Sequence, residues 1–177
     1  KNPGAVFHPP NQPPSSKHPA PVSQRSETRH NFNRTNEREF TMGELRVHYL
    51  PQNVAADELA GSTVVVIDLL RATSTICQAL AAGATEVVPF LEVEDALAAA
   101  AANRSNIILG GERGGRRIDG FDLGNSPSEY TPATVGGHRV FITTTNGTRA
   151  LHHARQAERV IVGAFLNLSA VAEPLQN

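Results

Sequence analysis

The sequence predicts an α/β fold with three layers, α/β/α, built on a mostly parallel sheet. Two observations predict this class. From Met42 onward, short runs of β-branched residues alternate with alanine-rich stretches of helical length. The short runs are also apolar along their whole length, which is typical of strands that are buried on both faces.

The individual elements follow from this alternation. Strands are expected at five runs, which span 64–68, 86–90, 106–109, 139–143 and 159–163. Helices are expected over 74–82, 93–102 and 148–157, and Gly83 is a suitable residue to end the first. A further helix start is expected where Ser126, Pro127 and Glu129 form a capping box.

Two halves of the pattern resemble each other. The strand, hydroxyl-rich loop, helix and strand that begin at Val64 match those that begin at Arg139 at similar spacing. An internal βαβ duplication is therefore one hypothesis, and the alternative is that all such units look alike. In either case, loops at the carboxyl ends of parallel strands would face one crevice, where open α/β sheets bind ligands.

The first 41 residues differ in composition from the rest of the chain. They hold seven of the twelve prolines together with many Ser, Asn and Gln residues, and their few apolar residues are isolated. Such a segment buries too little apolar surface to offset its ordering entropy, so we expect residues 1–41 to form a disordered tail. Because the only methionine is Met42, our hypothesis is that the tail lies upstream of the true start of an α/β domain spanning 42–177.

The charge distribution limits the class of partner. Residues 42–177 carry ten basic and fourteen acidic side chains, which gives about -4. This balance argues against nucleic acid as the main partner. All ten basic residues are arginines, which excludes Schiff-base chemistry and a phosphate-loop lysine from this stretch. Arginine instead favours paired contacts with phosphate, sulfonate or carboxylate groups.

Cysteine content and hydropathy indicate the compartment. Cys77 is the single cysteine, so neither an internal disulfide nor a multi-cysteine metal centre is available. The longest apolar stretches, at 64–70 and 97–102, are well short of the roughly 20 residues that span a bilayer. We therefore expect a cytoplasmic protein that does not insert into a membrane.

The loop after the first predicted strand combines a carboxylate, an arginine and three hydroxyl groups at a helix start. Asp68 and Arg71 precede Thr73, Ser74 and Thr75. Free N–H groups at a helix start favour an anion, and the hydroxyls would donate hydrogen bonds to its oxygens. An ordinary helix cap is the alternative, but a cap needs only one hydroxyl. We therefore favour an anion site.

A second hydroxyl-rich loop follows the strand expected at 139–143. It consists of Thr143, Thr144, Thr145, Asn146 and Gly147. Threonines also suit a strand end, and Asn-Gly is a common turn, so the loop alone does not distinguish a turn from a ligand site. Its position opposite the first loop in the repeated pattern favours a ligand site.

Two further segments contribute candidates. Within Gly110–Gly115, Glu112 would bind a hard cation and Arg113 an anionic group, and the alternative is a flexible loop with a solvated ion pair. In the segment that follows, Asp122 and Asn125 are not needed for the capping box. They remain candidates for contact with a metal or a substrate.

Five motifs in order carry a resemblance to a known family: DLLRATST, GGERGG, FDLGNSPSEYTP, TTTNGTRAL and GAFLNLSAVAE. From about Leu45 to Glu173 the chain resembles 2-phosphosulfolactate phosphatase. The resemblance implies a magnesium-dependent enzyme that hydrolyses 2-phosphosulfolactate to sulfolactate and phosphate, a step of coenzyme M biosynthesis. It also implies that the domain continues beyond Asn177, whereas the tail has no counterpart.

The candidate residues suit this reaction. Magnesium takes one or two carboxylates together with substrate oxygens and water, and the candidate ligands are Asp68, Glu112 and Asp122. The expected catalytic residues are Asp68, Arg71, Glu112 and Arg113. Direct attack of water on phosphorus is favoured over an aspartyl-phosphate on Asp68, because no second aspartate follows two residues later.

Two other functions remain open at this point. One is a non-catalytic module that binds a small phosphorylated or sulfonated acid, and the other is a phosphatase of a different small phosphorylated acid. In each case the expected partner is a small anion. The sequence also leaves a homo-oligomer open.

Overall fold

The computed structural model describes residues 44–175. Residues from His48 onward belong to one compact unit, and Glu44–Val47 belong to a second, in which Arg46 forms an ion pair with Glu44. The tail predicted for residues 1–41 lies outside the described part of the chain. None of the helices in residues 44–175 is long and apolar enough to cross a membrane.

The strands form two sheets. Strand β1 (Thr63–Ile67) pairs in parallel with β6 (Arg159–Gly163). The second sheet has the order β2-β5-β3-β4, in which β2 (Glu86–Pro89), β5 (Arg139–Thr143) and β3 (Ile107–Arg113) are parallel. Within residues 44–175, only β4 (Arg116–Arg117) is antiparallel, and it pairs with the end of β3. The α/β class with mostly parallel strands is confirmed, but the described strands divide between two sheets instead of forming one.

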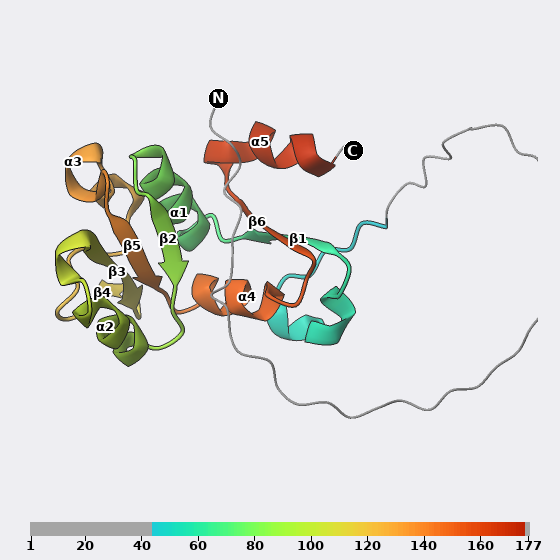
Figure 1. The fold of residues 1–177 in the computed structure, drawn as a ribbon. Coiled ribbons are helices and arrows are strands. Elements are labelled where there is room, and N and C mark those ends of the chain that lie inside the picture. Colours follow the sequence, from blue (N-terminus) through green and yellow to red (C-terminus); the bar gives the residue numbers. More distant parts are fainter. Residues whose placement is uncertain (1–43, 176–177) are drawn as a thin grey trace, which may run out of the picture. The chain divides into compact units, whose positions relative to one another are not determined.

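Helices connect and cover these strands. They are α1 (Ala72–Ala81), α2 (Val93–Ala101), α3 (Pro132–Val135), α4 (Gly147–Ala154) and α5 (Leu168–Ala172). The three helices predicted between strands are confirmed within a few residues. In Figure 1, α4 and α5 lie on opposite sides of the β1–β6 pair, and each of them contacts one of its strands.

The capping-box prediction was wrong in its extent. Pro127–Glu129 forms only one short 3-10 turn, and the next helix begins at Pro132. The physical reason is that the Ser126 and Glu129 side chains make other hydrogen bonds than those of a capping box. The Glu129 carboxylate accepts the Gly124 N–H, and the Ser126 hydroxyl contacts the Ser128 hydroxyl.

Helices α1 and α4 each cross from one sheet to the other. Helix α1 leads from β1 in the pair to β2 in the four-stranded sheet, and α4 leads from β5 back to β6. The chain therefore leaves β1 and β5 in opposite directions, each time toward the other sheet. A switch point of an open α/β sheet has the same arrangement. This arrangement does not test whether the two similar halves of the sequence share an ancestor. The internal duplication therefore stays a hypothesis.

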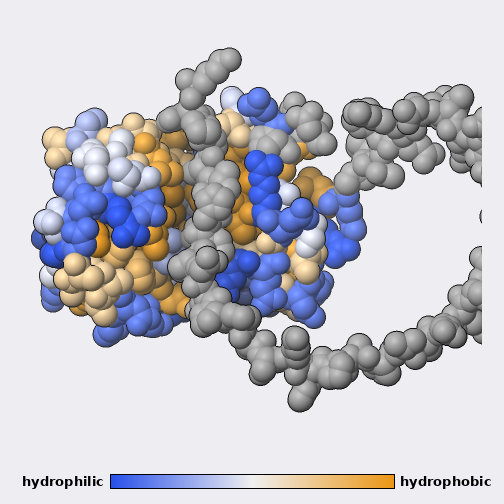
Figure 2. All heavy atoms as spheres, viewed as in Figure 1, coloured by the Kyte–Doolittle hydropathy of each residue, from blue (hydrophilic) through white to orange (hydrophobic). Residues whose placement is uncertain are grey.

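The core is made of apolar side chains between the strands and these helices. One cluster joins Val66, Ile76 and Leu151 between the β1–β6 pair, α1 and α4. Large apolar side chains also remain exposed after β1 and β6, among them Leu70 and Phe165. Figure 2 shows hydrophobic residues next to hydrophilic ones on the face that it draws.

Candidate active site

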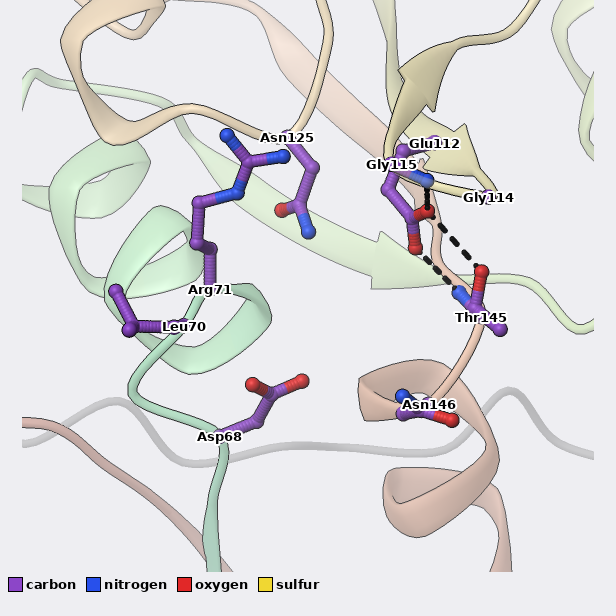
Figure 3. Close-up of a pocket in the computed structure, with 9 residues that line it drawn as sticks. All are labelled: Asp68, Leu70, Arg71, Glu112, Gly114, Gly115, Asn125, Thr145 and Asn146. Carbon is purple, nitrogen blue, oxygen red and sulfur yellow. Dashed lines mark hydrogen bonds between the residues drawn. The ribbon is translucent and has the colours of Figure 1, made fainter.

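A pocket of about 300 Å³ lies where the loops after β1, β3 and β5 meet. These strands run parallel within their sheets, so their carboxyl ends supply the pocket walls, as expected for a ligand site in an α/β fold. A fourth segment, around Asn125, completes the lining. The residues that line it, shown in Figure 3, are Asp68, Leu70, Arg71, Glu112, Gly114, Gly115, Asn125, Thr145 and Asn146.

Asp68 is the first carboxylate of the pocket and directly follows β1. Partial burial raises its pKa, a hydrogen bond from the Ala72 N–H acts in the opposite direction, and the negative charge of Glu112 adds to the increase. The carboxylate therefore occupies the N-terminus of α1 itself. The two carboxylates therefore repel each other within one pocket.

Glu112 is the second carboxylate and is only 8% exposed. Its Oε1 accepts the Thr145 N–H at 2.7 Å, and its Oε2 accepts the Gly115 N–H at 2.8 Å and the Thr145 hydroxyl at 3.1 Å. Burial acts to raise its pKa, but these hydrogen bonds and the nearby Arg113 hold the pKa below its ordinary value. Glu112 is thus an ionised group that joins two walls of the pocket (Figure 3).

The two arginines predicted to be catalytic occupy different environments. Arg71 lines the pocket, and its guanidinium makes no hydrogen bond or ion pair with any residue of the described chain. Arg113 does not line the pocket. Its guanidinium donates to the Leu91 carbonyl, the Thr143 hydroxyl and the Glu112 carbonyl. Of these two arginines, Arg71 is therefore the one placed to meet a ligand directly, whereas Arg113 bonds to Leu91, Thr143 and Glu112.

The three hydroxyls of the first loop are not among the pocket residues. Thr73 and Ser74 donate to the carbonyls of Asp68 and Leu69, and Thr75 donates to the carbonyl of Asn125. In the structure the three hydroxyls therefore bond to main-chain carbonyls, and their predicted contact with a ligand stays a prediction. Ser and Thr hydroxyls at a helix start commonly bond to nearby backbone groups. The ordinary helix cap is not observed either, because the N-cap residue of α1 is Arg71 and it makes no side-chain cap hydrogen bond.

The second loop contributes only part of its predicted set. Thr145 and Asn146 line the pocket. Thr143 bonds to Arg113, and Thr144 exchanges hydrogen bonds with Thr148 at the start of α4. Gly147 is buried beside Asp68, where its lack of a side chain is required.

Asn125 and Asp122 are also separated by the fold. Asn125 projects into the pocket, whereas Asp122 does not line it. The Asp122 carboxylate instead receives two hydrogen bonds from Arg104, at 2.7 and 2.8 Å, and one from the Leu109 N–H. The candidate ligands therefore divide into two carboxylates inside the pocket and a third that is held elsewhere.

The pocket contains two carboxylates, which are a type of group that magnesium takes as a ligand. In residues 44–175, no three His, Cys, Asp or Glu side chains gather into a metal cluster. Magnesium needs only one or two carboxylates when substrate oxygens and water complete its octahedron. The two mutually repelling carboxylates of Asp68 and Glu112 are such a pair, and a cation between them would relieve the repulsion.

Several residues that shape the site were absent from the sequence prediction. The backbone of Gly114 and Gly115 forms part of the wall, and Leu70 forms another part. Tyr130 is fully buried and donates its hydroxyl to the Gly124 carbonyl, next to Asn125. The clustered glycines were a signal for close backbone approach, but no local pattern indicated the contact of Tyr130.

The fold and pocket together define an α/β protein with a charged pocket at the carboxyl ends of its parallel strands. The family described as 2-phosphosulpholactate phosphatase matches residues 48–177. Because this match covers well over half of the sequence, the chain belongs to the 2-phosphosulfolactate phosphatase family.

Curated relatives agree with this assignment. A probable 2-phosphosulfolactate phosphatase of Clostridium novyi is 48% identical over 120 residues, which are 68% of this chain and 51% of the relative. One from Symbiobacterium thermophilum is 52% identical over 121 residues, 68% of this chain and 52% of the relative. A third, from Caldanaerobacter subterraneus subsp. tengcongensis, is 53% identical over 116 residues, 65% of this chain and 48% of the relative. The chain thus spans about half the length of these relatives.

Proposed function

We propose that this chain takes part in the hydrolysis of 2-phosphosulfolactate to sulfolactate and phosphate, with Mg²⁺ as cofactor. The observation that carries the proposal is the pocket itself. It brings together two carboxylates and a guanidinium that has no partner among residues 44–175, beside the N-termini of α1 and α4. Family membership and the names of the relatives support the same reaction class.

The substrate is a small polyanion, and the pocket offers it several positive or donating groups. Arg71 supplies a fixed charge and a planar set of N–H donors that match phosphate, sulfonate or carboxylate oxygens. The first turns of α1 and α4 lie so close together that a side chain on Gly147 would overlap with that of Ala72. Two helix N-termini therefore add their partial positive charge on the same side.

Asp68 and Glu112 would hold the magnesium ion. When bound, the ion supplies positive charge that stabilises the charge developing on the phosphoryl oxygens and on the leaving oxygen. The three hydrogen bonds to Glu112 fix the orientation of its carboxylate, and the Ala72 N–H does the same for Asp68.

We favour direct attack of water on phosphorus. The oxygen of water forms a bond to phosphorus as the ester P–O bond breaks. The water loses one proton in this step, and the released alkoxide takes up one proton to become the hydroxyl of sulfolactate, so the protons balance. Asp68 is the carboxylate that would orient this water, since it faces the pocket from the end of β1 (Figure 3). Formation of an aspartyl-phosphate on Asp68 is the competing route.

The test is phosphate release from 2-phosphosulfolactate by the full chain, with magnesium and then with excess chelator. The same assay includes sugar phosphates and other phosphorylated acids at equal concentration. We expect release from the phosphosulfonate that the chelator abolishes. Faster release from another phosphorylated acid would show that the preferred substrate is that acid and not 2-phosphosulfolactate. No release by a folded protein that still binds the substrate would favour a non-catalytic binding module.

A further inference from the structure

The Asn125 amide is a buried polar group without a complete set of partners. The residue is 6% exposed, and its Oδ1 makes no hydrogen bond to any residue of the described chain. The large majority of buried side-chain polar atoms in proteins have a hydrogen-bond partner, and leaving an acceptor unpaired lowers stability. The amide also points into the pocket (Figure 3), so the missing partner is to be sought there.

The segment that carries Asn125 is firmly held. The Tyr130 hydroxyl donates to the Gly124 carbonyl at 2.7 Å, and Glu129 Oε2 accepts the Gly124 N–H at 2.8 Å. On the other side, the Thr75 hydroxyl donates to the Asn125 carbonyl at 3.2 Å. In the neighbouring strand β3, position 110 is a glycine, and a side chain there would overlap with the Tyr130 hydroxyl. The unpaired amide is therefore not the result of a loosely held loop.

A donor without a partner lies in the same pocket. The Arg71 guanidinium has five N–H donors and makes no hydrogen bond within residues 44–175. In Figure 3, Arg71 and Asn125 project into the pocket from two different segments. An unpaired acceptor and an unpaired donor thus line one site.

We propose that Asn125 is a positioning residue for Arg71 when an anion occupies the pocket. Arg71 donates one N–H to Asn125 Oδ1 and presents its remaining N–H groups to the oxygens of the anion. This arrangement satisfies the buried Oδ1 and fixes the guanidinium in one orientation, which a long arginine side chain alone does not achieve. The inference rests on the proposed function only in that the pocket must accept a phosphate group.

The test is a double-mutant cycle read by binding of inorganic phosphate to the full chain, measured by calorimetry with magnesium present. The four proteins are the native chain, Asn125→Ala, Arg71→Ala and the double variant. We expect Asn125→Ala to weaken phosphate binding roughly tenfold in the native background. In the Arg71→Ala background we expect it to weaken binding by less than about twofold, because the group that it positions is gone.

Controls separate positioning from a structural role. Asn103→Ala changes the same residue type outside the pocket and is expected to bind phosphate like the native chain. Circular dichroism checks each fold, and Asn125→Ser replaces Asn125→Ala in the cycle if the alanine variant does not fold. A merely structural role would lower the melting temperature without making the two substitutions interdependent.

Two results would overturn the inference alone. One is an equal weakening by Asn125→Ala in both backgrounds, which would show that Asn125 acts independently of Arg71. The other is phosphate binding that Asn125→Ala leaves unchanged. If the native chain itself binds no phosphate, the proposed function fails, and the inference fails with it.

Discussion

At the scale of single residues, Glu112 has two consequences for the site. Its carboxylate accepts three hydrogen bonds, which join the turn between β3 and β4 to the loop before α4. Because these donors stabilise the charged form, the pKa of Glu112 stays below its ordinary value despite burial. Glu112 therefore shapes the pocket whether or not a metal is bound.

Glu112→Gln should destabilise the ligand-free chain. The amide nitrogen of Gln donates where the carboxylate accepted, so at least one of the Thr145 or Gly115 N–H groups loses its acceptor. We expect a loss of about 1–3 kcal/mol in the free energy of unfolding, measured by urea denaturation. The matched control is Glu158→Gln, an exposed position where a change within about 0.5 kcal/mol is expected. Equal stability of the two variants would contradict a joining role for Glu112.

Cys77 is a free cysteine whose buried environment lowers the reactivity of its thiol. It is a buried residue of α1 that faces the core, and burial raises the pKa of its thiol to about 11. The thiolate is the reactive form, and relative to a thiol of pKa 9.0 its fraction near neutral pH falls on the order of 100-fold. We expect labelling by a thiol reagent at pH 8 to be slow in the native chain and rapid in denaturant. Fast labelling of the folded chain would contradict this burial.

At the scale of elements, the site depends on how closely α1 and α4 begin to each other. Gly147 is the first residue of α4, and a Cβ there would overlap with the Ala72 side chain and lie 3.0 Å from Asp68 Oδ2. The overlap explains why a glycine stands at this position.

Gly147→Ala should therefore separate the two helix starts and displace Asp68. We expect phosphate release to fall at least about tenfold and stability to fall by about 1–3 kcal/mol, as in overpacked cores. Gly61→Ala is the control, since its added Cβ meets open space and only its φ of +73° is strained. That variant should lose stability without loss of phosphate release. A Gly147→Ala chain with native activity would show that the spacing of the helices does not matter.

At the scale of the whole molecule, the sequence was most informative about element type and order. Runs such as VVVID and RVIVG combine β-branched composition with continuous hydrophobicity, and they form β1 and β6 within a residue of the predicted bounds. These are local properties, so they can be seen without the fold. The division into two sheets could not be seen, because it depends on α1 and α4 crossing between strands that are distant in sequence.

The site was predicted less completely, for a related physical reason. The sequence placed Asp68, Arg71, Glu112, Asn125, Thr145 and Asn146 among the candidates, and all six line one pocket. It did not distinguish Arg71 from Arg113, because only the fold brings Leu91 and Thr143 to the second guanidinium. Nor did it show that Arg104, 18 residues away, holds Asp122. Competition among polar partners is decided by tertiary contacts and not by residue type.

The most direct measurement is the rate of phosphate release from 2-phosphosulfolactate, with magnesium, by the native full-length chain and by Asp68→Asn. The substitution keeps the shape of the side chain and removes its charge, and Asp119→Asn, at an exposed position outside the pocket, is the matched control. We expect the native chain and the control to release phosphate at similar rates, and Asp68→Asn, shown to be folded, to fall to background. Release by Asp68→Asn at the native rate would contradict the assignment of this pocket as the active site.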